Sequence, residues 1–226
     1  MRSLETVSVV EALMDDLERR VLNGELAAGE HLRETELAEE YGVGRHTLRA
    51  AFDGLVARCL LQKERNRGVF VRVLTRDDLT EIYQLRIALE VEAFRTVATR
   101  REVPPDAAKA VALLLTLDSR SPQRDFVEAD LAFHSAIVEA AGNWRLSRAH
   151  ESLQAEIRLL LAQLVNRYAS VRELAKEHRD LLAAIEGGDP AVAEAAIRDH
   201  LDRATEWLAE HAVTRTSPPL ASTGPD

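Results

Sequence analysis

The stretch Glu36–Leu61, ELAEEYGVGRHTLRAAFDGLVARCLL, constrains the fold more than any other part of this chain. Apolar residues recur at helical spacing on both sides of Gly42-Val43-Gly44, which predicts two short helices joined by a sharp turn. The second predicted helix opens with side chains that form hydrogen bonds: Arg45, His46, Thr47 and Arg49. A helix-turn-helix places the N-terminal residues of its second helix in the DNA major groove. The stretch therefore predicts a DNA-binding motif.

The flanking segments extend this motif to a winged helix-turn-helix. Residues 9–23 have the apolar spacing of an amphipathic helix that ends before Gly24. Residues 62–73 change to an alternating pattern, and Asn66-Arg67-Gly68 supplies turn residues, so a short β-hairpin is expected there. Residues 1–74 are accordingly predicted to form the DNA-binding domain.

From Thr75 onward the pattern is helical throughout. Thr75 can cap the first helix, and prolines or glycines stand at most of the later breaks. Six helices are predicted, over residues 77–101, 105–119, 122–141, 144–166, 170–186 and 190–212. Short loops favour antiparallel neighbours, so residues 75–213 are expected to form an all-α antiparallel bundle. Residues 214–226, with three prolines and little apolar content, are expected to be a disordered tail. The fold class is mainly α.

Charge is divided unevenly along the chain. The net charge is -9, yet residues 45–72 contain seven basic and two acidic residues, a local charge of +5. Phosphate contacts require such a basic segment, and the acidic remainder is not expected to bind DNA. The single cysteine fits a reducing compartment, and neither a signal peptide nor a membrane-length apolar run is present, so a cytoplasmic protein is expected.

The sequence resembles the GntR family of bacterial transcriptional regulators, in the branch with an all-helical FCD domain. The resemblance covers nearly the whole chain. Its N-terminal pattern consists of three motifs: Gly24-x-Leu26-x-x-Gly29-x-x-Leu32-x-Glu34-x-x-Leu37-Ala38, Gly42-Val43-x-Arg45-x-x-x-Arg49-x-Ala51/Phe52-x-x-Leu55, and Gly68-x-Phe70-Val71. The chain departs from the family pattern at Gly44, Thr47, Phe52 and Cys59, where Ser, Pro, Leu and Gly are usual. Gly44 removes a hydroxyl cap from the second helix.

The resemblance implies particular DNA contacts. Arg45 and Arg49 match the arginines that read DNA, either at guanine or at phosphate, while His46 and Thr47 occupy variable positions. Gly68 resembles the glycine at the wing tip, and Arg33, Arg65 and Arg67 are candidate phosphate contacts. The alternative is that these are ordinary solvated arginines.

A candidate metal site lies in the helical half. Asp130 and His134 are four residues apart and leave one helix face together, and His178 and His200 lie on later predicted helices. A bundle can bring such residues to one interior point. Three imidazoles and a carboxylate suit zinc best, with nickel or manganese acceptable. The FCD pattern of Asp-x-x-x-His and two later histidines agrees. The alternative is four unrelated surface or core residues.

An effector site is expected beside this metal. Arg86 matches an arginine that commonly faces the pocket in the family, where it would pair with a small organic acid, and Tyr83 is predicted to line the same face. The alternative for Arg86 is a surface ion pair with Glu90.

These features together predict a dimeric, ligand-responsive regulator, most simply a repressor, and not an enzyme. Two winged modules would bind a pseudo-palindromic double-stranded operator, and dimerisation is implied by the family likeness. Two alternatives remain at this point: a metal-dependent hydrolase, because an ion with open positions activates water, and a structural-metal DNA-binding protein without effector response.

Overall fold

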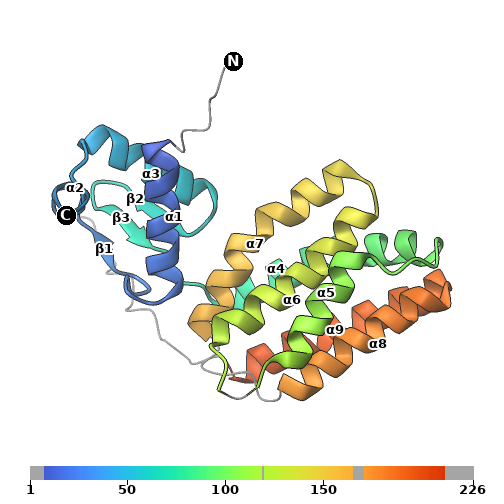
Figure 1. Cartoon of the computed structure of the whole chain (residues 1–226). Coiled ribbons are helices and arrows are strands. Elements are labelled where there is room, and N and C mark those ends of the chain that lie inside the picture. The colour runs from blue at the N-terminus through green and yellow to red at the C-terminus, as the bar shows by residue number, and fades with distance from the viewer. Residues whose placement is uncertain (1–7, 119, 165–170, 212–226) are drawn as a thin grey trace, which may run out of the picture.

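The computed structural model describes residues 8–118, 120–164 and 171–211 (Figure 1). Its N-terminal part contains the predicted winged helix-turn-helix. The elements are α1 (Val9–Leu22), β1 (His31–Leu32), α2 (Glu34–Tyr41), α3 (Arg45–Ala57), β2 (Leu61–Glu64) and β3 (Gly68–Val71). The strands form one antiparallel sheet in the order β1-β3-β2. The short strand β1 was not predicted, and it pairs His31 with Phe70 and Leu32 with Val69.

The turn between α2 and α3 has the expected backbone. Helix α2 ends at Gly42 in the left-handed region, with φ +64°, and its amide donates back into the last turn. Gly44 precedes α3 in extended conformation and offers no side-chain cap, as its sequence predicts. The apolar side of α3, with Leu48, Phe52 and Leu55 fully buried, packs against α1. The amino-terminal residues of α3 are therefore left on the outside.

The backbone conformation at Cys59 explains why glycine is the usual residue at this position. The residue follows α3 and has a φ of +58°, in the left-handed region. A side chain at such a φ is uncommon because Cβ crowds the backbone, whereas glycine adopts it freely. The chain makes this sharp exit from α3 with a cysteine.

The C-terminal part is all α, as predicted. Its helices are α4 (Arg76–Ala98), α5 (Pro105–Thr116), α6 (Gln123–Ala140), α7 (Trp144–Leu164), α8 (Val171–Gly187) and α9 (Pro190–His211). The predicted bounds that fall on described residues are correct within three residues. The predicted bounds at residues 119, 166, 170 and 212 and the tail 214–226 lie outside the described residues. Helix α4 contacts α6, α7, α8 and α9, so it runs through the middle of the bundle.

Thr75 begins α4 with a reciprocal cap. Its hydroxyl accepts from the Asp78 amide, and the Asp78 carboxylate accepts from the Thr75 amide. This arrangement confirms the cap expected at Thr75.

The two parts meet where the wing leads into α4. Arg72 pairs with Asp78 at 2.6 Å and with Glu156 of α7 at 2.8 Å. The Gln163 side chain, also on α7, accepts from the Leu74 amide at 3.0 Å and donates to the Arg72 carbonyl at 2.7 Å. Helix α7 thus holds the segment that joins the two halves. None of the described helices is long and apolar enough to cross a membrane.

Candidate metal centre and adjoining pocket

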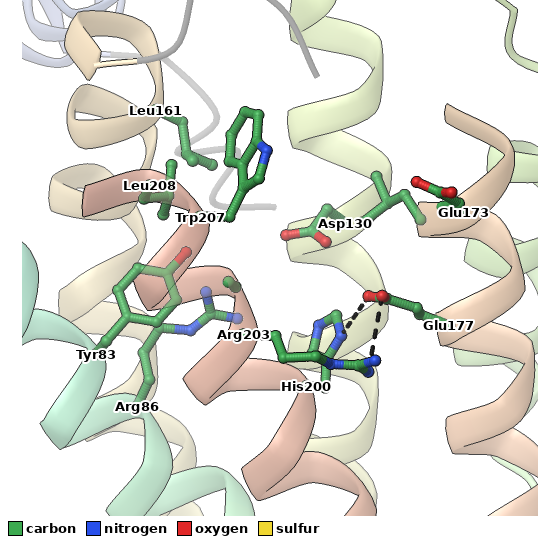
Figure 2. Close-up of a pocket in the computed structure, with 12 residues that line it drawn as sticks. Tyr83, Arg86, Asp130, Leu161, Glu173, Glu177, His200, Arg203, Trp207 and Leu208 are labelled. Atoms are coloured by element: carbon green, nitrogen blue, oxygen red, sulfur yellow. Dashed lines mark hydrogen bonds and ion pairs between the residues drawn. The ribbon is translucent and has the colours of Figure 1, made fainter. Parts of the chain in front are cut away.

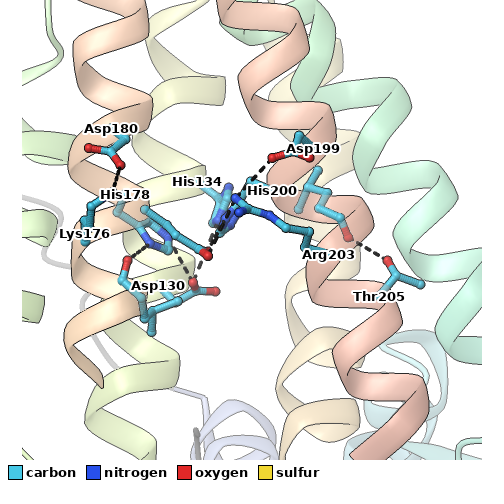
Figure 3. Close-up of polar contacts among 12 residues, drawn as sticks. Asp130, His134, Lys176, His178, Asp180, Asp199, His200, Arg203 and Thr205 are labelled. Atoms are coloured by element: carbon cyan, nitrogen blue, oxygen red, sulfur yellow. Dashed lines mark hydrogen bonds and ion pairs between the residues drawn. The ribbon is translucent and has the colours of Figure 1, made fainter. Parts of the chain in front are cut away.

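The four predicted metal ligands converge inside the bundle. Asp130 and His134 come from α6, His178 from α8 and His200 from α9, and all four side chains are buried. Their ligand atoms all lie within 4.8 Å of one another (Figure 3). Metal–ligand bonds are about 2.0–2.2 Å long, so a small contraction of this cluster would let all four residues hold one divalent ion.

Each histidine is oriented by a partner on its Nδ1 atom. His134 Nδ1 lies 2.5 Å from Glu90 Oε2, and His200 Nδ1 lies 3.1 Å from Glu177 Oε2. His178 Nδ1 donates to the Leu174 carbonyl at 2.8 Å. These contacts place the proton on Nδ1 and leave Nε2 with its lone pair. Acceptors of this kind fix the tautomer of metal-binding histidines and raise their basicity.

The inward-facing nitrogens lack ordinary partners. The Nε2 atoms of His134 and His178 are buried and have no hydrogen-bond partner among the described residues. His178 Nε2 lies 3.0 Å from Asp130 Oδ1, and His134 Nε2 lies 3.9 Å from the same oxygen. Leaving buried polar atoms unpaired costs free energy, which a divalent cation at this point would recover. The donor set and its geometry therefore fit a divalent metal.

Burial and charge set the protonation of this cluster. Burial lowers the pKa of His134 to about 4, against the opposing effect of Glu90, so the ring is neutral at pH 7. Burial also lowers the pKa of His200. Burial acts to raise the pKa of Asp130, but His178, His134 and Arg86 outweigh it, and the pKa lies well below its ordinary value. Neutral imidazoles and an ionised carboxylate are the forms that bind metals.

Glu90 connects the metal centre to two more helices. Its carboxylate is fully buried and contacts Arg86 Nε at 2.8 Å, His134 Nδ1 at 2.5 Å and His150 Nε2 at 3.3 Å. Burial alone would raise its pKa, but Arg86 and His134 hold the pKa well below the ordinary value. The predicted alternative, a surface pair of Arg86 and Glu90, is half correct: the ion pair exists, but it is buried because α6 and α7 cover this face of α4.

A pocket opens beside the metal centre (Figure 2). It has a volume of about 270 Å³, and both predicted effector residues, Tyr83 and Arg86, line it together with Asp130 and His200. The guanidinium carbon of Arg86 lies 4.9 Å from the centre of the Tyr83 ring, and Arg86 Nη2 is buried without a hydrogen-bond partner among the described residues. A buried cation with a free donor favours an anionic ligand.

The predicted DNA contacts lie together on the other half of the molecule. Arg45, His46 and Arg49 are exposed at the start of α3, and Thr47 is half-buried. Arg33 is exposed directly before α2, and Arg65, Arg67 and Gly68 form the exposed wing tip. Gly68 has a φ of +106°, and a Cβ there would lie 2.5 Å from His31 Nε2. The φ of Gly68 is one that residues with a Cβ rarely adopt, so the backbone conformation at the wing tip favours glycine.

Sequence reasoning missed the partners of the metal-facing rings. The sequence did not single out His150 or Glu177, and it suggested Glu90 only as the partner of Arg86 in a surface pair. The missed signal was position: His150 and Glu90 lie on the apolar sides of their helices, where an ionisable side chain needs a partner.

Two family models match the chain in tandem. The model described as bacterial regulatory proteins, gntR family, matches residues 9–71, and the FCD domain model matches residues 81–203. The chain belongs to the GntR family. Its C-terminal half is an FCD domain, and the protein is a transcriptional regulator rather than an enzyme. This finding removes the hydrolase alternative.

Similar proteins support the same assignment. A "Probable D-xylose utilization operon transcriptional repressor" from Paenarthrobacter nicotinovorans is 30% identical over 201 residues, covering 88% of each chain. The galactonate operon transcriptional repressor of Escherichia coli (strain K12) is 26% identical, covering 91% of this chain and 99% of that protein. A GntR transcriptional regulator from Rhodococcus sp. RHA1 has a TM-score of 0.74 at 25% identity, covering 89% and 97%.

Proposed function

We propose that this GntR-family regulator is a homodimeric repressor whose helical domain binds a divalent metal and a small carboxylic acid. The convergence of three imidazole nitrogens and one carboxylate oxygen on a buried point carries this proposal. The adjoining pocket adds the free donor of Arg86. Zinc suits the donor set best, with nickel and manganese acceptable.

Different residues would bind the metal, orient the histidine rings and bind the carboxylate at this site. A bound metal would supply a Lewis-acid centre whose remaining coordination positions accept a carboxylate oxygen. Asp130, His134, His178 and His200 would hold it, while Glu90, Glu177 and the Leu174 carbonyl keep the rings in the required tautomer. Arg86, held by Glu90 through Nε, would direct Nη2 at the second carboxylate oxygen of the effector.

The N-terminal half, residues 1–74, is the proposed DNA-binding domain. Arg45 and Arg49 at the start of α3 would enter the major groove with His46 and Thr47 beside them, and Arg33, Arg67 and Gly68 would contact the backbone. A two-fold dimer places two such modules on a pseudo-palindromic operator. A dimer of this type would act in the cytoplasm on double-stranded DNA.

Helix α7 provides a physical link from the effector site to the wing. His150 of α7 contacts Glu90, which contacts both His134 and Arg86. Further along the same helix, Glu156 and Gln163 hold Arg72 and Leu74 after the wing. An effector that favours one position of α7 would therefore favour one placement of the DNA-binding half, which changes operator affinity by population shift.

The names of two relatives suggest which genes this regulator controls. Their names refer to the operons for D-xylose utilization and for galactonate, and galactonate is itself a carboxylate. We infer that this regulator controls genes for the breakdown or transport of a small organic acid.

The decisive experiment measures operator binding with and without metal and acid. An operator is first selected from random DNA with zinc-loaded protein, and binding is then followed by fluorescence anisotropy with acetate as the probe. Acetate is expected to change operator affinity by about 5- to 150-fold, the usual range of allosteric coupling. Arg86→Met should remove the response while keeping the metal, and Arg145→Met, at the exposed start of α7, should keep both.

Two results would count against the proposal. Tight zinc binding with no effect of acetate, or of larger acids, on operator affinity would support a structural metal instead. A monomer in sedimentation analysis of the protein–operator complex would contradict the dimer.

A further inference from the structure

We propose that the effector of this regulator is a monocarboxylic acid with a compact apolar body, either branched aliphatic or a single aromatic ring. The inference rests on the proposed function, because it assumes that a carboxylate binds at the metal and Arg86. It specifies the chemistry of the part of the ligand beyond the carboxylate. It follows from the different polarity of the two sides of the pocket and from the charge at its rim.

The polar side of the pocket offers a place for one carboxylate. Asp130 and His200 mark the metal centre on this side, and Arg86 reaches between them and the Tyr83 ring (Figure 2). Arg86 Nε is already used by Glu90, which leaves the Nη2 donor for the ligand. One carboxylate that contacts both the metal and Arg86 Nη2 would satisfy the metal centre and this free donor together.

The opposite side of the pocket is largely apolar, apart from the Tyr83 hydroxyl and the Trp207 indole nitrogen (Figure 2). Leu161 of α7 and Trp207 and Leu208 of α9 gather there, with the Tyr83 ring below (Figure 2). Ala204, four residues before Leu208 on α9, also lines the pocket. Leu161 and Leu208 are each only 2% exposed. Leucine and alanine side chains cannot hydrogen-bond a ligand hydroxyl, so a hydroxylated carbon placed against them would lose its water without compensation. An apolar carbon there would gain free energy instead.

The rim of the pocket disfavours a second carboxylate. Glu173 and Glu177 of α8 line this rim, with Arg203 of α9 as the basic residue beside them. Arg203 is shared between Glu177 at 3.6 Å and Asp199 at 3.2 Å. A dicarboxylic acid would therefore bring its second negative charge towards two glutamates and only one arginine, a rim of net negative charge. Like charges at this range repel.

The size of the pocket sets the size of the body. A volume of about 270 Å³ falls below the 300–1,000 Å³ typical of pockets for drug-sized ligands. A five-carbon branched acid or benzoic acid is of the appropriate size.

The test compares five acids on the zinc-loaded protein. The chain has two tryptophans, so Trp144→Phe leaves Trp207 in the pocket as the sole reporter. Acetate, 3-methylbutanoate, benzoate, succinate and galactonate are each titrated by tryptophan fluorescence and by calorimetry. Each added buried methylene is worth about fourfold in affinity. We expect 3-methylbutanoate and benzoate to bind at least about tenfold more tightly than acetate, and succinate and galactonate no more tightly than acetate.

A variant of the apolar wall isolates the body of the ligand. Ala204→Leu fills space in the pocket and should abolish the gain of 3-methylbutanoate and benzoate over acetate while zinc content stays unchanged. Ala195→Leu introduces the same side chain at an exposed position of α9 outside the pocket and should preserve the gain. Both positions are on a helix that tolerates leucine well.

The outcomes separate this inference from the proposed function. If acetate binds but galactonate or succinate binds more tightly than the apolar acids, the apolar-body inference is wrong and the proposed function stands. An unchanged gain in Ala204→Leu would also overturn it. If none of the five acids binds zinc-loaded protein, the proposed function itself fails.

Discussion

The two halves of the molecule hold their functional side chains in opposite ways. The candidate DNA-binding arginines are exposed, and some of them are already paired with acidic neighbours, among them Arg49 with Glu34 at 2.7 Å and Arg33 with Glu36 at 2.9 Å. The candidate metal ligands are buried, and two of their inward-facing nitrogens have no hydrogen-bond partner among the described residues. The candidate DNA-binding side chains are thus solvated, whereas the candidate metal ligands are polar groups in the protein core.

This difference determines what each half needs from its ligand. Exposed ion pairs contribute little to stability and are exchanged for phosphate or base contacts at little cost. Buried nitrogens are fixed before the ligand arrives, so the metal centre is preorganised and metal binding should also stabilise the fold. The comparison therefore predicts large effects on stability in the buried half and moderate, salt-sensitive effects in the exposed half.

The largest effect should follow from loss of the metal. Zinc at about one hundred times its Kd should raise the Tm of the wild type by roughly 5–10 °C. His178→Ala or His134→Ala should abolish stoichiometric metal and the shift, because a buried ligand is missing. Elemental analysis and thermal melts measure both quantities, with His46→Ala, an exposed histidine of α3, as the control. A full metal complement in the two variants would contradict the ligand assignment.

Acid should destabilise the metal-free protein in a defined window. The pKa of His134 is lowered from 6.5 to about 4 by burial, so the unfolded chain takes up a proton that the folded chain resists. The contribution of His134 to the free energy of unfolding is therefore fully present above pH 6.5. It is lost as the pH falls towards 4, and the loss is roughly 3 kcal/mol. The lowered pKa of His200 acts in the same direction. Urea midpoints across this range provide the measurement, and a flat profile would contradict the burial of neutral rings.

Glu90→Gln tests whether the buried partners matter. The amide keeps the shape of the side chain but removes the charge that orients His134, so metal affinity should fall by about 10- to 100-fold. Competition with a coloured chelator measures the affinity. Glu92→Gln changes an exposed glutamate two residues away on α4 and should bind metal like the wild type. Equal affinities in the two variants would show that Glu90 only fills space.

Arg49→Ala tests the exposed half. The substitution should cost about 1–3 kcal/mol of operator binding, because a groove-facing arginine contributes a charged hydrogen bond to base or phosphate. Anisotropy titrations at several salt concentrations measure the loss. Arg148→Ala removes an exposed arginine from α7 in the helical half and should bind normally. Unchanged affinity in Arg49→Ala would remove Arg49 from the predicted DNA contacts.

The smallest effect is expected from Glu34→Gln. This variant releases Arg49 from its partner and removes a negative charge near the DNA, so operator affinity should rise by at most about fivefold, or 1 kcal/mol. The same titration measures it, with Glu81→Gln on α4 as the matched control. A loss of affinity would show that Glu34 positions Arg49 rather than competes for it.

Sequence periodicity was sufficient for most of the fold, because helices and hairpins are coded by local spacing. The strand β1 was missed because two residues are too short to show a period, and its partner, Phe70, lies 39 positions along the chain from His31. The spacing of Asp130 and His134 predicted one shared face, and the structure brings His178 and His200 to it. That these four residues bind a metal stays a prediction.

The Glu90 cluster shows what local spacing cannot provide. An Arg and a Glu four residues apart are typical of an exposed helix face, and the same spacing occurs here in the core. Its burial depends on α6 and α7 packing against α4, which is a property of the whole bundle. Residues that act through a histidine from another helix therefore become visible only in three dimensions.

The Gln163 side chain has a practical consequence for dissecting the protein. Its amide group pairs with the Arg72 carbonyl and the Leu74 amide near the end of the winged domain, much as an adjacent strand would. A fragment that stops at residue 74 would expose these groups and deprive Arg72 of Glu156. A chimaera that joins this DNA-binding domain to a different ligand-binding domain would leave the same groups unpaired. The new domain would have to supply an amide and a carboxylate at the junction.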